Sequence, residues 1–319
     1  MNIGSLISAL PGAVAQGLIW GIMAIGVFLT YKVLDFADLT VDGTMATGGA
    51  VCVMLLLNGV NLWVALLCAV LAGMVAGLVT GLFHTAMGIP AILSGILTQL
   101  SLYSVNLAIM GFKANQGINF RTTKILISSR NVKVIGLENP IFIMVIVTGL
   151  LIAVLYWFFG REIGAALRAT GSNEHMARAQ GINTKFNTVL GFMLANALVS
   201  LAGALLSQYQ GSADVNMGRG AIVIGLAAVI IGEVIFGKIF INFALRLLAV
   251  IIGAVIYYIV LQIILQLGLN TNDLKLLTAI LVAIFLAIPY IKGKVAPKKV
   301  PVPAAAEAET PAEGGEKDA

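Results

Sequence analysis

The chain has 319 residues, of which 60% are hydrophobic and only 10% are charged, and its mean hydropathy is +1.01. Soluble domains are roughly 45–50% apolar, so this composition excludes a water-soluble domain and predicts a polytopic membrane protein. The formal net charge is +5. The basic residues lie between apolar runs, where they set the orientation of spans, so the charge does not indicate a nucleic-acid partner.

The first apolar run, Gly12–Leu34, exceeds the about 20 residues that a membrane-spanning helix needs. Gly17 and Gly21 lie four residues apart within it, and this spacing of small residues lets a second helix approach closely. Another clear span, Leu62–Phe83, carries glycines at successive four-residue steps. We expect tight helix packing on the glycine face of each span.

A shorter glycine-rich run, Gly43–Leu57, separates these two spans and is marginal for a full crossing. It is either a short tilted span or a segment that re-enters the membrane where protein shields its backbone. Asp42 directly precedes this run, in a place where an unpaired charge is costly. We therefore expect Asp42 either to lie on a solute path or to cap the N-terminus of the second span.

The next run, Ile89–Gly111, is unusually polar for a span. Its polar side chains fall on two neighbouring faces at helical spacing, Ser94, Thr98 and Ser101 on one face and Gln99, Tyr103 and Asn106 on the other. Polar stripes are costly against lipid. They indicate either the lining of a solute path or hydrogen bonds between helices.

A long polar segment, Phe112–Asn139, precedes the apolar span Pro140–Phe159 and contains five basic residues. Because that span separates it from the charged loop that follows, the two polar segments lie on opposite sides of the membrane. If the charged loop is cytoplasmic, residues 112–139 lie outside. This is a local departure from the rule that basic loops face the cytoplasm.

The loop Gly160–Lys185 concentrates charged residues between two apolar runs and lies outside the bilayer. Two helical pieces are predicted within it, Glu162–Ala169 and Asn173–Gln180, and Ser172 or Asn173 caps the second. A short capped helix with small residues suits docking into a cleft on another protein. The alternative is an ordinary positively charged cytoplasmic loop.

Three more runs follow, Phe186–Leu206, Ala221–Phe236 and Ile239–Leu267, with a turn-rich external connection at Ser207–Gly220. Glu233 and Arg246 flank the turn between the last two runs, about 6 Å and about 12 Å from it at the helical rise. We expect them to form an intramembrane charge pair, or to reach the interface separately. Tyr258 and Gln262 lie on one stripe and are further candidates for the path.

The last predicted span is Leu274–Tyr290, and four lysines after it argue for a cytoplasmic C-terminus. Residues 1–295 thus form one transmembrane domain, while residues 296–319 have the composition of a disordered tail. The fold class is an all-α polytopic membrane protein of about 8–10 helices. About nine crossings, or eight if Gly43–Leu57 re-enters, place the N-terminus outside.

Two stretches resemble a known family, the branched-chain amino acid permeases of ABC importers. They are Leu34–Gly43, with its Thr-Val-Asp-Gly ending, and the loop motifs Gly160-Arg161, Arg168-Ala169, Met176-Ala177 and Gly181-Ile182-Asn183-Thr184. The subgroup that the chain is most similar to is the bacterial tryptophan/tyrosine permeases. One departure is that Ala165-Ala166 stand where the wider importer motif opens with Glu-Ala-Ala.

The resemblance implies a type II ABC importer permease in the bacterial inner membrane, working as a homodimer or with a related permease. It implies an ATPase subunit that binds ATP and Mg, and a substrate-binding protein that delivers an amino acid or similar solute. The residues expected to couple the permease to the ATPase are Arg161, Arg168, Gly171, Asn173, Glu174, Met176, Ala177, Gly181 and Ile182.

The chain has no G-x-x-x-x-G-K-[S/T] loop, so it has no P-loop of its own for ATP. His84 and His175 are solitary and Cys52 and Cys68 lie inside apolar runs, so neither a metal site nor a cofactor is predicted. We expect a transport subunit and not an enzyme. The alternatives are an ABC permease for a sugar or nucleoside, and a stand-alone secondary transporter or channel.

Overall fold

The computed structural model describes residues 3–118, 123–133, 136, 138–237, 239–266, 276, 278–280, 282–285 and 287. Its helices are α1 (Ile3–Phe28), α2 (Thr40–Leu57), α3 (Leu62–Thr85), α4 (Ala91–Ile109), α5 (Pro140–Phe159), α6 (Glu162–Ser172), α7 (Glu174–Ala179), α8 (Thr184–Gln210), α9 (Ala221–Phe236) and α10 (Phe243–Gln266). A π-helical turn η1 (Leu29–Val33), a 3₁₀ turn η2 (Ser129–Lys133) and two short strands complete it. The all-α prediction is confirmed.

Within the described residues, seven helices are long and apolar enough to cross a membrane, and α9 is a shorter apolar helix. The predicted spans Pro140–Phe159 and Ala221–Phe236 coincide with α5 and α9. The predicted last span, Leu274–Tyr290, falls mostly outside the described residues. The predicted tail, residues 296–319, lies wholly outside them.

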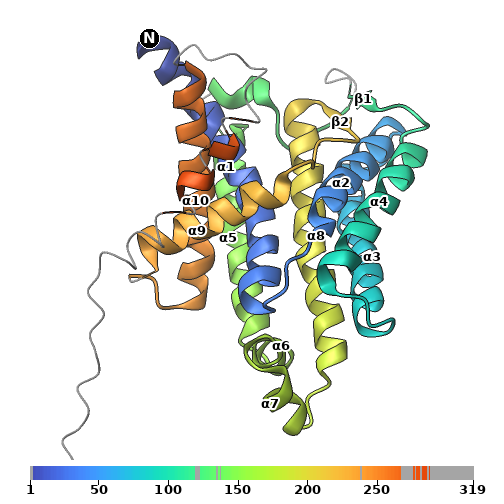
Figure 1. The fold of residues 1–319 in the computed structure, drawn as a ribbon. Helices are drawn as coiled ribbons and strands as arrows, with labels where there is room; N and C mark the ends of the chain where they lie inside the picture. The colour runs from blue at the N-terminus through green and yellow to red at the C-terminus, as the bar shows by residue number, and fades with distance from the viewer. Residues whose placement is uncertain are drawn as a thin grey trace, which may run out of the picture.

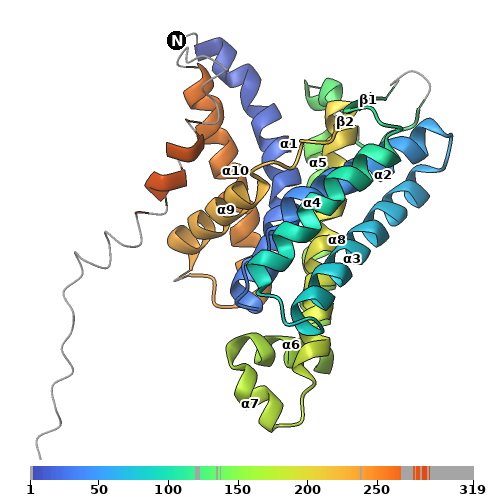
Figure 2. The same ribbon diagram turned by 45° about the vertical axis from the view of Figure 1, so that its right-hand side comes forward.

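The helices form an elongated bundle whose two ends differ (Figure 1). Helices α6 and α7 project from one end, called here the α6–α7 end, and the small sheet lies at the other, called the sheet end (Figure 2). Helix α5 joins the two ends. This arrangement agrees with the prediction that the polar segments before and after Pro140–Phe159 lie on opposite sides.

Helix α8 packs against α1, α2 and α3, so it forms the centre of the bundle. The glycine face of α3 packs on α8, because a Cβ at Gly73 or Gly77 would overlap backbone carbonyls of α8. On α1, Gly17 and Gly21 face Val255 and Ile251 of α10. The predicted tight packing at both glycine faces is confirmed.

Helix α2 is largely buried among α3, α4 and α8, and it begins part-way along the bundle (Figure 1). A Cβ at Gly48 would overlap the carbonyl oxygen of Ser200, and a Cβ at Gly203 would overlap that of Met45. Backbone therefore meets backbone where α2 crosses α8. The glycine-rich run is a short, protein-enclosed helix, which explains its weak signal as a span.

The two predicted external segments meet in space. Strand β1 (Asn115–Gly117) pairs antiparallel with β2 (Ser212–Asp214), and Gln116 lies opposite Ala213. Leu126 donates its backbone N–H to Oε1 of Gln208 at 2.9 Å, which adds a contact between the same two regions. The two segments therefore form one folded unit at the sheet end and are not independent loops.

Candidate functional site

A buried hydrogen-bond network lies where the chain enters α2. The carboxyl group of Asp38 accepts from the Thr40 backbone N–H at 2.9 Å and from Nδ2 of Asn196 at 2.7 Å. The Oδ1 atom of Asn196 in turn accepts from the Thr44 hydroxyl at 2.7 Å. All four side chains are almost wholly buried. Because buried polar groups are costly unless paired, this network fixes α2 against α8.

A second chain of hydroxyl groups joins α2, α3 and α4. The Thr40 and Thr80 hydroxyls are 2.8 Å apart, and Thr80 donates to Thr98 at 2.9 Å. The Ser94 hydroxyl bonds backbone carbonyls at the start of its own helix. Thr98 therefore takes part in a hydrogen bond between helices, which is the second of the two interpretations of its stripe, while Ser94 is buried and, among the described residues, bonds only the start of its own helix. Ser101 lies on the exposed side of α4.

The other polar stripe of α4 borders a cavity of about 210 Å³. Its lining residues are Asp42, Gly43, Gln99, Leu100, Tyr103, Asn106, Val215 and Arg219. We call it the α4 cavity. Among the described residues, the buried Oδ1 atom of Asn106 has no hydrogen-bond partner, while Nδ2 donates to the Gly43 carbonyl at 3.3 Å. The structure thus gathers four of the predicted path residues, Asp42, Gln99, Tyr103 and Asn106, at one place.

Asp42 has a partner that sequence spacing did not reveal. Its Oδ2 atom accepts from the Gly220 N–H at 2.9 Å and its Oδ1 atom accepts from the Ile222 N–H at 3.0 Å. These amides open α9, and a carboxylate at a helix N-terminus is favoured by the unpaired N–H groups and the helix dipole. Asp42 is a capping residue, as one alternative proposed, but it caps α9 and not the second span.

Tyr258 and Gln262 do not border the α4 cavity. Both lie on α10, and the centre of the Tyr258 ring lies 5.8 Å from the centre of the Trp20 ring on α1. Tyr258 is buried there. Its neighbours make it part of the α1–α10 packing, while Gln262 is half-buried on the same helix.

Helices α6 and α7 form the predicted pair at the α6–α7 end, with different boundaries. Helix α6 runs on to Ser172, so the break falls at Asn173 and not at residues 170–172. Asn173 caps α7 by accepting the Met176 N–H at 2.9 Å, as one of the two predicted caps. Gly181 has a φ of +81°, a conformation that suits glycine after a helix end.

The candidate coupling residues divide into an exposed set and an inward set. The exposed set is Arg161, Arg168, Asn173, Glu174, Met176 and Gly181, with Ile182 half-buried. Ala177 is 0% exposed, and a Cβ at Gly171 would overlap the carbonyl oxygen of Val33 at the end of η1. These two small residues let α6 and α7 pack on their own chain. Ala177 is therefore not available as a docking surface, whereas Gly171 is half-buried.

Two arginines of the loop contact residues at the C-terminal end of α5. Arg161 lies 5.1 Å from the centre of the Trp157 ring, at a distance typical of a cation–π contact. Arg168 donates to the Phe159 carbonyl at 3.0 Å and so satisfies a free carbonyl at the C-terminus of α5. Glu174 pairs with Arg178 and accepts from the Thr184 hydroxyl at 3.1 Å. These contacts fix α6 and α7 relative to α5 and α8.

The predicted charge pair between Glu233 and Arg246 is wrong. Glu233 pairs with Lys32, whose Nζ lies 3.1 Å from Oε1 and 2.9 Å from Oε2 of the carboxylate. Lys32 lies in η1, the π-helical turn that directly follows α1. Lys32 and Glu233 are 201 residues apart, so spacing along the chain does not indicate that they meet.

The family described as the permease component of branched-chain amino acid transport systems matches residues 10–288. The chain belongs to this family. It is therefore a transport permease and a multi-pass inner-membrane protein of the ABC type, which confirms the family resemblance found in its sequence motifs.

Three relatives illustrate how similar known proteins are to this chain. The tyrosine transport system permease protein of Clostridioides difficile is 39% identical over 280 residues, which are 88% of this chain and 91% of that protein. The uncharacterized protein RP368 of Rickettsia prowazekii is 33% identical, covering 92% and 99%. The D-allose transport system permease protein AlsC of Escherichia coli is 26% identical, covering 69% and 64%.

Several residues of the site were missed from sequence. Asp38 and Asn196 form the centre of the buried network, and Arg219 borders the α4 cavity. A signal was available for Asn196, since it interrupts the apolar run Phe186–Leu206. No comparable signal marks Arg219, which lies in a turn-rich connection where arginine is common.

Proposed function

We propose that this permease is the membrane-spanning subunit of an ATP-driven importer for an amino acid, delivered by a substrate-binding protein. The observation that carries the proposal is the 39% identity to a tyrosine transport system permease over 88% of the chain. Family membership supports the transport class, and the degree of identity favours an amino acid over a sugar.

The α4 cavity is where we propose that the solute path runs. Tyr103 is 45% exposed and Gln99 is half-buried, on a helix whose other large exposed side chains are apolar. Polar groups facing lipid would be costly. We propose that a second permease subunit, of the same or a related chain, covers this side of α4 and that the path runs along it.

The exposed side of α6 and α7 supports a docking surface for the ATPase. Met176 is 50% exposed at the far end of the molecule, although large apolar side chains in water are unfavourable. In the proposed complex the ATPase covers Met176 and binds the ATP and Mg that drive transport. The opposite sheet end, built from β1 and β2, is then the docking side for the substrate-binding protein.

Copurification tests the ATPase interaction. We expect Met176→Arg to abolish capture of the ATPase by the tagged permease, because it places a charge in an apolar contact. The matched control is Met87→Arg, since Met87 is also an exposed methionine but lies outside α6 and α7. Equal capture by both variants would contradict the proposed docking surface.

A sugar permease is the second candidate, because relatives named for D-allose and ribose transport are 26% and 27% identical to the chain. A thermal-shift screen of the cognate substrate-binding protein against amino acids, sugars and nucleosides separates the two. We expect stabilisation by an amino acid. Stabilisation by a sugar or nucleoside alone would replace the amino acid proposal.

A further inference from the structure

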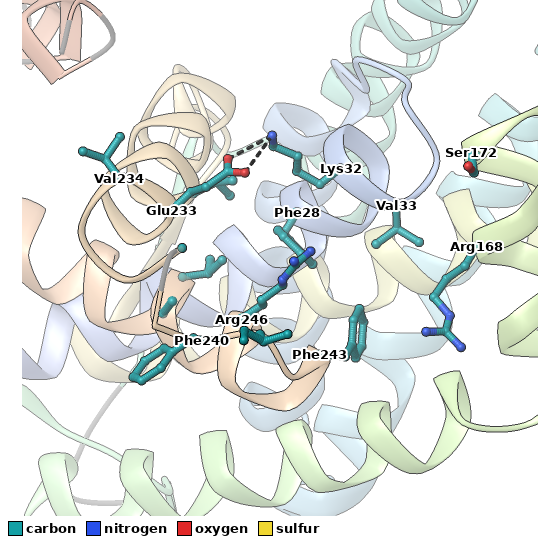
Figure 3. A pocket seen from close by; sticks show the side chains of 16 residues that line it. Phe28, Lys32, Val33, Arg168, Ser172, Glu233, Val234, Phe240, Phe243 and Arg246 are labelled. Atoms are coloured by element: carbon teal, nitrogen blue, oxygen red, sulfur yellow. Dashed lines mark hydrogen bonds and ion pairs between the residues drawn. The ribbon is translucent and has the colours of Figure 1, made fainter. Parts of the chain in front are cut away.

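A second cavity in the described part of the chain is distinct from the α4 cavity. It has a volume of about 910 Å³ and lies toward the α6–α7 end, between η1, α6, α9 and α10. Figure 3 shows side chains that line it from these elements. We call it the basic cavity, because three cationic side chains and a single acidic one line it among the described residues, namely Lys32, Arg168, Arg246 and Glu233.

The positive charge of this cavity is only partly neutralised. Glu233 is the acidic partner of Lys32, with Nζ within 3.1 Å of both carboxylate oxygens. Arg168 donates one N–H to the Phe159 carbonyl, and within the described part of the chain it forms no ion pair. Among the described residues, the guanidinium of Arg246 makes no hydrogen bond or ion pair. It points into the cavity in Figure 3.

The rest of the wall is apolar. The rings of Phe28, Phe240 and Phe243 line the cavity, and Phe243 lies 6.3 Å from Phe28 between ring centres. This mixture selects against a small hydrophilic anion, which would leave the aromatic surface exposed to water. It suits a molecule with an anionic head and a hydrocarbon body.

The turn between α9 and α10 carries exposed apolar side chains next to the cavity. Ile239 and Ile241, in this turn, are 68% and 81% exposed. Exposed isoleucines are unfavourable in water but stable among lipid chains near the head groups. Ile241 also lines the cavity, so its opening lies beside these exposed apolar side chains.

We propose that the basic cavity is a binding site for an anionic phospholipid of the membrane leaflet at the α6–α7 end. The phosphate group binds Arg246, with Lys32 and Arg168 adding positive charge, and an acyl chain lies along Phe240 and Phe243. Basic cavities between membrane helices attract anionic head groups, because the electrostatic gain of each cation near the surface adds to burial of the lipid chain.

A lipid bound in this site would contact the loop that joins α5 and α8. Arg168, Gly171 and Ser172 belong to α6, whereas Lys32 and Arg246 belong to η1 and α10. A bound lipid therefore contacts α6 and the transmembrane helices together. It would stabilise one position of α6 relative to the bundle.

Native mass spectrometry of the purified full-length permease tests the proposal directly. The probes are phosphatidylglycerol, which is anionic, and phosphatidylcholine, which is zwitterionic, with matched acyl chains. We expect selective retention of phosphatidylglycerol. Arg246→Gln should weaken this retention about fivefold, the effect of one cation near an anionic lipid, while Arg246→Lys should preserve most of it.

Two further variants make the test specific. Lys185→Gln removes an exposed cation of the same loop outside the cavity and should leave retention unchanged. Ser172→Glu adds an anion to the cavity wall at an exposed position and should lower retention independently of Arg246. Thermal unfolding of each variant without added lipid confirms that it is folded.

Several results would overturn the proposal. They are equal retention of the two lipids, unchanged retention in both Arg246→Gln and Ser172→Glu, and a loss of retention in Lys185→Gln as large as that in Arg246→Gln. Complete displacement of phosphatidylglycerol by inorganic phosphate at equal concentration would show that the site takes a free anion and not a lipid. None of these readouts needs transport activity.

Discussion

The carboxylate of Asp42, in the first turn of α2, caps α9 by accepting the backbone N–H of Ile222, 180 residues later in the chain. A second bond from Gly220 completes the cap. The same carboxylate borders the α4 cavity, beside Asn106 and Arg219. One residue of the conspicuous Thr-Val-Asp-Gly motif therefore fixes the helix that follows the sheet end and contributes to the cavity next to it.

The first prediction concerns this cap. Asp42→Ala removes both acceptors from the start of α9 and should destabilise the permease by about 2 kcal/mol. Asp42→Asn keeps one acceptor oxygen and should lose roughly half as much. Thermal unfolding in detergent measures both changes. Equal stability of wild type and Asp42→Ala would show that the cap contributes nothing.

The second prediction concerns the close approach of α2 and α8. Gly203→Ala should destabilise the fold by about 1–3 kcal/mol, because the new Cβ overlaps the Met45 carbonyl oxygen. Gly149→Ala on α5 is the matched control, since nothing lies within 4 Å of the position of its added Cβ. Yield and thermal stability of the folded permease measure the difference. A control variant as unstable as Gly203→Ala would rule out this explanation.

The third prediction concerns the buried pair Asp38 and Asn196. Asn196→Ala leaves one Asp38 oxygen and the Thr44 hydroxyl without that partner, which should cost about 2–3 kcal/mol. The exchanged double variant, Asp38→Asn with Asn196→Asp, keeps an N–H donor between the two groups and should regain most of the loss. A double variant less stable than Asn196→Ala would mean that the contact has another basis.

The fourth prediction concerns orientation. In a chain with Cys52 and Cys68 replaced by alanine, Ser172→Cys should react with a membrane-impermeant maleimide only in inside-out vesicles. Ser172 is exposed at the α6–α7 end. Lys113→Cys, near the sheet end, should react only in intact cells stripped of outer membrane. Labelling of Ser172→Cys from the outside would reverse the proposed direction of the whole permease.

Local sequence patterns predicted the helices well, because each apolar run reports its own length. The boundaries of α5 and α9 agree with the predicted runs. The glycine steps of α3 correctly indicated a face for close packing, and only small residues permit such an approach. The family followed from short motifs that lie in the loops Leu34–Gly43 and Gly160–Lys185.

Pairing between distant residues did not follow from these patterns. Lys32 meets Glu233 across 201 positions, so the nearer Arg246 was wrongly chosen as the partner. Ser94 and Tyr103 belong to the same helix, yet one lies in the packed interior and the other beside a cavity. Periodicity places residues on faces of a helix, but only the tertiary packing decides what each face meets.

ATP-dependent uptake in proteoliposomes tests the central claim most directly. The permease is reconstituted with its ATPase and substrate-binding protein, and radiolabelled tyrosine, leucine and ribose are offered in turn. We predict accumulation of an amino acid that requires all three proteins and ATP, and that Met176→Arg abolishes. Uptake by the permease alone, or ATP-driven uptake of ribose without any amino acid, would contradict the account.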